Sequence, residues 1–148
     1  TVINAYRNAI DDYIKSPDSY DYTKYLKEIE KTKTRGLTTF YFNSRDNKDF
    51  QDYSGNQYNA EYEFGAKVIE KENDKYIVEI KNRLKVGDTL EIILPGQIEP
   101  IKFELEALWD VETDEVIDFI NPGKANQKVK MKLPVEAKSG YIIRRKKD

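Results

Sequence analysis

The first fifteen residues carry a helical pattern of apolar side chains. One helix face is marked by five positions that recur every three or four residues: Val2, Tyr6, Ala9, Ile10 and Tyr13. The run Ser16-Pro17-Asp18 then interrupts the pattern, because proline lacks the N–H that a helix interior requires. The pattern therefore predicts a helix that ends near Ser16.

A second helix is predicted from about residue 21 to residue 32. Asp21 suits an N-cap position, and a stripe of apolar side chains follows it: Tyr22, Tyr25, Leu26 and Ile29. Together the two segments indicate a helical hairpin or linker over residues 1–33. Residues 33–58 are mostly polar apart from the short apolar run 40–42, so a long loop is expected there.

Beyond residue 58 the period of the pattern changes from 3.6 to 2. In residues 101–109, for example, Ile101, Phe103 and Leu105 alternate with charged side chains, as in a half-buried strand. Similar runs occupy residues 64–72, 76–81, 89–94, 116–119, 127–133 and 141–144. Turn signals such as Gly87-Asp88 and Pro95-Gly96 separate them. We therefore predict a mainly β fold, with a small antiparallel β-barrel over residues 34–148 that forms a single compact unit with the helices before it.

The composition excludes several classes of catalytic site. The 148 residues include no His and no Cys. A Ser-His-Asp relay, a thiolate nucleophile, a zinc site built on His or Cys and an iron–sulfur cluster are therefore ruled out for this chain. No apolar run approaches the ~20 residues of a membrane-spanning helix. We expect no metal, no cofactor and no membrane contact, and a cytoplasmic location.

The net charge of −2 hides a strong asymmetry along the chain. Residues 61–120 hold 7 basic and 16 acidic side chains, whereas residues 121–148 hold 9 basic and 2 acidic ones. The C-terminal segment is thus the basic part of the molecule. Lys128, Lys130 and Lys132 alternate along one predicted strand, and Arg144 and Arg145 lie near the end of the chain.

Such a lysine stripe is suited to the phosphate backbone of RNA, with exposed tyrosines as stacking platforms. A solubilising surface is the plainer interpretation. Arg35 precedes the turn residue Gly36 and is suited either to bind a carboxylate or phosphate, or to tie the hairpin to the barrel. The candidate substrate-binding residues are Arg35, Lys128, Lys130, Lys132, Arg144 and Arg145.

Glu104 and Glu106 are the candidates for catalysis by paired carboxylates. Two positions apart on one strand, they would face the same side about 6.5–7 Å from each other. That spacing is typical of a general acid/base pair, but it is also what a water-facing strand surface produces. The pair could alternatively form salt bridges with the basic C-terminal segment.

Four stretches of the chain form a distinctive series: AYRNAID at 5–11, TRGLTT at 34–39, KNRLKVGDTLEI at 81–92 and IIRR at 142–145. In sequence and in order they resemble the C-terminal region of peptidase family U32, the collagenase-like peptidases. Two positions depart from the family pattern, since Thr34 stands where the family has His and Phe40 where it has Gly. Any role that rests on that His is therefore not expected here.

The resemblance implies that the chemistry belongs to a preceding barrel-type domain. Members were named as proteases, and relatives take part in hydroxylating tRNA or ribosomal RNA. We thus expect a non-catalytic C-terminal accessory domain that positions an RNA or polypeptide substrate, or a partner, for the upstream catalytic domain. A protein-binding or dimerisation module is the alternative, and an autonomous hydrolase using Glu104 and Glu106 is the third.

Overall fold

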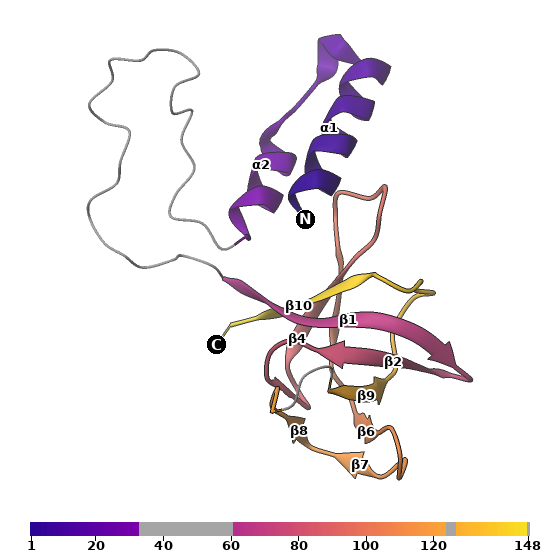
Figure 1. Ribbon diagram of the computed structural model, residues 1–148. Helices are drawn as coiled ribbons and strands as arrows, with labels where there is room; N and C mark the ends of the chain where they lie inside the picture. Colours follow the sequence, from indigo (N-terminus) through magenta and orange to yellow (C-terminus); the bar gives the residue numbers. More distant parts are fainter. Residues whose placement is uncertain (33–60, 124–126, 148) are drawn as a thin grey trace, which may run out of the picture.

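The computed structural model describes residues 1–32, 61–123 and 127–147. The predicted boundary between residues 33 and 34, the loop over residues 33–58 and the candidate Arg35 lie outside these residues. The described chain is mainly β, with two helices at its N-terminus, as predicted. Figure 1 shows the helices side by side at one end of the sheet.

The N-terminal segment forms the predicted helical hairpin. Its elements are α1 (Val2–Lys15), the short 3-10 helix η1 (Pro17–Ser19) and α2 (Thr23–Glu30). Helix α1 ends before Pro17, as predicted. The second helix starts two residues later than predicted, with Tyr22 at the N-cap position. Asp21 still serves the helix start, because its Oδ1 accepts a hydrogen bond from the Thr23 N–H at 2.9 Å.

The remaining elements are short antiparallel strands. They are β1 (Tyr62–Glu72), β2 (Lys75–Ile80), β3 (Leu84–Lys85), β4 (Thr89–Ile93), β5 (Ile101–Glu104), β6 (Leu108–Asp110), β7 (Val116–Ile117), β8 (Phe119–Ile120), β9 (Lys128–Met131) and β10 (Ile142–Lys146). Within the described residues, eight strands form one sheet in the order β5-β4-β10-β1-β2-β9-β6-β7, while β3 pairs with β8. The sheet curls into a half-barrel (Figure 1).

The long strand β1 provides the bend that this curl requires. Its register shifts twice, between Phe64 and Ala66 against β10 and between Val68 and Glu70 against β2. Such bulges bend a strand and increase its twist. Gly65 lies at the first shift, where a Cβ would come within 3.1 Å of the Leu84 Cδ2 atom. The missing side chain therefore allows β1 to approach β3 closely.

The concave side of the sheet encloses the hydrophobic core. The alternation that predicted half-buried strands supplies its members: Ala66, Val68, Tyr76, Val78, Ile80, Leu84, Leu90, Ile92, Leu105, Leu108, Ile120, Val129, Met131 and Ile143. None of them comes from α1 or α2. The helical hairpin therefore contributes no side chain to the main hydrophobic core.

A tight turn joins β3 to β4 and is hydrogen-bonded to Leu105, the residue that follows β5. Gly87 adopts a φ of 93°, and its N–H donates to the Leu105 carbonyl at 2.8 Å. The Asp88 carboxylate accepts a hydrogen bond from the Lys85 N–H at 2.8 Å. The Val-Gly-Asp sequence of this turn thus has a geometric reason, since only glycine adopts this φ without strain.

Replacing Gly87 with alanine should lower the free energy of unfolding by about 1–2 kcal/mol, because an L side chain is strained at this φ. Urea denaturation followed by circular dichroism measures the change. Gly123→Ala is the matched control: its φ is ordinary and an added Cβ would meet only Gln127 Oε1, at 3.8 Å. Equal losses of unfolding free energy in the two variants would contradict the claim that the φ of Gly87 requires glycine.

Candidate functional site

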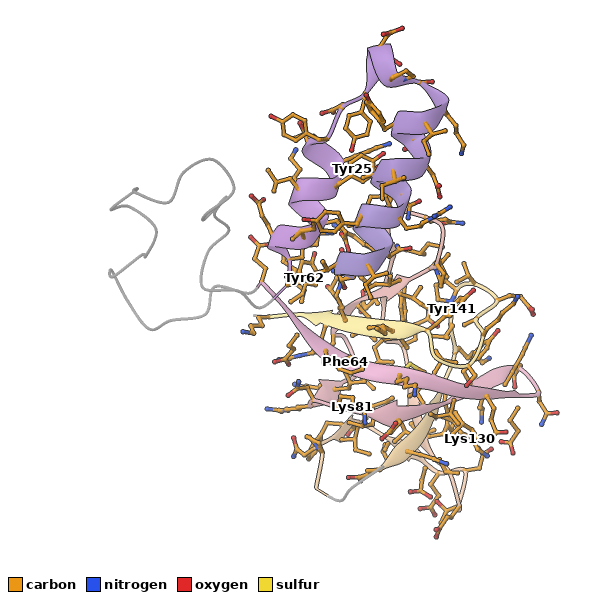
Figure 2. All side chains as sticks on the ribbon, turned by 45° about the horizontal axis from the view of Figure 1, so that its top comes forward. Tyr25, Tyr62, Phe64, Lys81, Lys130 and Tyr141 are labelled. Carbon is orange, nitrogen blue, oxygen red and sulfur yellow. The ribbon has the colours of Figure 1, made fainter. Side chains whose placement is uncertain are left out.

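The lysine stripe of β9 lies against carboxylates. The Lys130 ammonium is 2.7 Å from Glu72 and 3.3 Å from Asp114, and its side chain is only 11% exposed. The Glu72 carboxylate is the chief reason that the pKa of Lys130 is raised; burial opposes the rise. Figure 2 shows Lys130 low on the sheet. Its charge is therefore neutralised within the protein.

The two neighbouring lysines are more accessible. Lys132 lies 3.1 Å from Asp74, and both side chains are more than half exposed. This pairing is the main cause of a lowered pKa at Asp74. Lys128 is exposed and lies opposite Glu79 in the β2–β9 register. The stripe thus lies beside a line of acidic residues, and this pairing brings acidic and basic segments together in one sheet.

The basic end of the chain has a structural role at Arg144. Arg144 is 5% exposed; its Nη2 donates to Glu91 at 2.6 Å, and its Nη1 lies 2.8 Å from Glu28 of α2. Lys31 completes this group at 3.1 Å from Glu28 and 3.4 Å from Glu91. We call these four residues the junction cluster, because they join α2 to β4 and β10.

The junction cluster pairs the Arg144 guanidinium with two carboxylates of the protein itself. Tyr62 packs beside it, with the Arg144 guanidinium 5.2 Å from the ring centre, and Figure 2 shows Tyr62 where the helices meet the sheet. Burial, followed by the nearby Glu91 charge, raises the pKa of Tyr62 to about 12. The other candidate, Arg145, lies 2.7 Å from Glu63 and 3.7 Å from Asp88.

Asn4 makes a second connection between the hairpin and the sheet. Its side-chain amide donates to the Gln97 carbonyl at 2.7 Å, and its Oδ1 accepts from the Gly96 N–H at 3.1 Å. Both partners belong to the turn between β4 and β5. The hairpin is therefore held to the sheet largely by ion pairs and hydrogen bonds.

The predicted continuous strand over residues 101–109 is wrong. Strand β5 ends at Glu104, where Leu105 turns inward and its N–H donates to the Asp88 carbonyl at 2.9 Å. Pairing resumes only at Leu108. The turn around Gly87 imposes this break, because Leu105 bonds to it on both sides. Glu104 and Glu106 therefore do not lie on one strand face, because Glu106 follows the end of β5.

Glu104 and Glu106 nevertheless line one groove, with a volume of about 520 Å³. The groove residues are Phe103, Glu104, Glu106, Ala107, Trp109, Lys132, Leu133 and Pro134. The fold thus brings together two predicted carboxylates and one predicted lysine. The apolar residues of the groove, which we call its floor, were not predicted as part of a site: Phe103, Ala107, Trp109, Leu133 and Pro134. Trp109, the single tryptophan of the chain, was the one of them that the sequence could have singled out.

The groove lies at the open edge of the half-barrel. Strand β5 is the last strand of the sheet and pairs only with β4 among the described strands. The other wall comes from β6 and the residues that follow β9. In the described part of the chain, no hydrogen bond or ion pair holds the carboxylates of Glu104 and Glu106. The arrangement is therefore suited to binding rather than to a positioned acid/base pair.

Among the described residues, no group of three or more Asp or Glu side chains could hold a metal ion. No helix there is long and apolar enough to cross a membrane.

Comparison with known proteins gives a family match and two structural neighbours. Residues 60–144 match the model of the peptidase family U32 C-terminal domain. A crystal structure of the C-terminal domain of a Geobacillus thermoleovorans protein assigned to the U32 peptidases is 24% identical, with a TM-score of 0.49, covering 57% of this chain and 93% of that chain. Its selenomethionine variant is also 24% identical, with a TM-score of 0.48, covering 55% and 98%. No curated protein matches.

Replacing Arg144 with methionine should cost about 3–5 kcal/mol of unfolding free energy, because it removes the buried cation between Glu28 and Glu91 and leaves the more exposed Lys31 beside both carboxylates. Lys132→Met, which breaks an exposed pair, should cost no more than about 1 kcal/mol. Urea denaturation at neutral pH measures both. Similar small losses would show that the junction cluster contributes no more than a surface ion pair.

Proposed function

Because the chain belongs to peptidase family U32 through the C-terminal domain at residues 60–144, we propose that it is a non-catalytic accessory domain. In this proposal it binds a polypeptide in the groove between β5 and β6 and presents it to a catalytic domain elsewhere in the same protein. The observation that carries the proposal is the groove itself. Its floor is apolar and its rim carries both signs of charge.

The chemistry of the groove matches that of an extended peptide. Phe103, Trp109 and Leu133 offer apolar surface for peptide side chains, while Glu106 and Lys132 can pair with charges of either sign. Strand β5 adds backbone groups at the sheet edge, where a peptide can pair as a further strand. Affinity would come from the backbone, and selectivity from the side chains on the floor.

The same contacts favour a polypeptide over RNA. A phosphate backbone needs unpaired cations, whereas Lys130 is held by two carboxylates and Arg144 is buried. Glu72, Asp74 and Asp114 lie beside the stripe and would repel phosphates. Of the predicted RNA contacts, Lys128 and Lys132 are exposed in the described structure. RNA binding stays a prediction, and the test below includes it.

The single tryptophan allows a direct binding test. Titration with a tryptic digest of gelatin, which contains almost no tryptophan, should change the fluorescence of Trp109 in a saturable way. Phe103→Ala should weaken peptide binding at least tenfold. Glu106→Lys should change how strongly binding depends on the charge of the peptide. Phe119→Ala is the matched control, since Phe119 is 53% exposed and lies on β8, outside the groove.

Three outcomes would contradict the proposal. The first is an unchanged fluorescence at saturating peptide. The second is binding of tRNA at low salt, lost on raising the salt and abolished by Lys128→Glu, which would assign the domain to nucleic acid. The third is cleavage of gelatin by the purified chain that disappears in Glu104→Gln, which would make it an autonomous hydrolase.

A further inference from the structure

Helix α1 turns most of its apolar side away from the rest of the molecule, although Tyr13 on that side also packs edge-on against Tyr20. Its inner side carries Ala5, which is fully buried, and the polar residues Asn4 and Asp12. Asn4 bonds to the β4–β5 turn, while Asp12 accepts hydrogen bonds from Lys24 and Tyr25 of α2. Figure 2 shows Tyr25 between the two helices. The contact that forms the hairpin is thus largely polar on the α1 side.

The outer side of α1 carries six exposed apolar residues, which we call the outer stripe. They are Val2 (41% exposed), Ile3 (87%), Tyr6 (61%), Ile10 (51%), Tyr13 (54%) and Ile14 (72%). At 100° per residue they fall within a 120° arc of the helix. Four of them were predicted from the sequence as one helix face, but the described chain does not cover that face.

The exposed area of the outer stripe is that of an interface. Taking roughly 200 Å² for a fully exposed large side chain, the six residues expose about 700 Å². The largest apolar patch of a typical monomer is about 300–600 Å². Each partner in a standard protein–protein interface buries about 800 Å². The stripe is therefore large enough to form most of one side of a stable dimer.

The order of the stripe is symmetric about position 8. Val2 and Ile14, Ile3 and Tyr13, and Tyr6 and Ile10 are each equidistant from it. An antiparallel copy of α1, related by a twofold axis at that level, would place each apolar residue opposite another. Twofold interfaces require this self-complementarity, in which residue i meets j and j meets i.

The charges beside the stripe also suit a second copy. Arg7 and Asp11 border it on one side and pair within the helix at 2.9 Å. In the antiparallel arrangement, this side of the stripe in one copy lies next to the same side in the other copy. Arg7 of one copy therefore comes within reach of Asp11 of the other. A membrane surface is disfavoured, because the basic residues Arg7 and Lys15 of α1 are balanced by Asp11 and Asp12.

We propose that two copies of this chain associate through the outer stripes of their α1 helices, antiparallel and about a twofold axis at the level of residue 8. The interface extends the protein beyond its groove, since it lies on the hairpin and involves no groove residue. The dimer carries two grooves, one on each half-barrel.

Light scattering after size-exclusion chromatography tests the association. At tens of micromolar the chain should elute with twice its mass of 17.4 kDa. Ile10→Glu and, separately, Ile3→Glu should weaken dimerisation at least tenfold, because each buries a charge in the interface. Val116→Glu, at an apolar residue of β7 whose exposure of 66% lies between those of Ile10 and Ile3, should leave the dimer intact. Circular dichroism checks that every variant folds.

Disulfide trapping tests the antiparallel order, and the absence of native cysteine makes it unambiguous. An equimolar mixture of Tyr6→Cys and Ile10→Cys chains should form a crosslinked dimer on oxidation. Each variant alone should form much less. Crosslinking of each variant mainly with itself would indicate a parallel pair and overturn the proposed arrangement.

Three further results would overturn the proposal. One is a chain that stays monomeric at all concentrations. Another is a dimer that survives both glutamate substitutions, which would place the interface elsewhere. The third is a monomer that co-sediments with phosphatidylcholine vesicles through the stripe, which would assign it to a membrane surface.

Discussion

The arrangement of the described structure depends on one buried cation. Arg144 of β10 lies between Glu91 of the neighbouring strand and Glu28 of α2, so a single guanidinium connects the hairpin to the centre of the sheet. Glu91 is fully buried and would be unfavourable without a cation. Lys31 balances the second carboxylate. This local neutrality lets charged groups occupy a position that apolar side chains would otherwise fill.

The sequence predicted element types better than the surroundings of individual side chains. Local periodicity was sufficient for the helices and for most strands, because each pattern depends on neighbours within a few residues. It failed after Glu104, where Leu105 is buried as predicted but bonds to a turn almost twenty residues earlier, so that the strand pairing stops until Leu108. It also could not assign partners to Lys130 or Arg144, because their partners are distant in the chain. Glu72 and Glu91 come close through the arrangement of the strands, and Glu28 through the contact of α2 with the sheet.

The groove is a second feature that the sequence pattern did not predict, although several of its residues were predicted individually. Glu104, Glu106 and Lys132 were singled out for separate reasons, and the curl of the sheet brings them together with Trp109. That curl originates in the two bulges of β1, a strand that contributes no residue to the groove. A binding surface can thus depend on backbone irregularities several strands away, which single-sequence patterns do not reveal.

The polar attachment of the hairpin has a thermodynamic consequence. Because the main core contains no residue of α1 or α2, separating the hairpin from the sheet would expose little apolar surface. Heat-capacity change and denaturant sensitivity both scale with the surface exposed. Partial opening at this junction would therefore be nearly invisible to calorimetry and to urea. Because the ion pairs of the junction cluster are buried, added salt would also screen them only weakly, so such an opening would be detected by a local probe at the junction rather than by a bulk measurement.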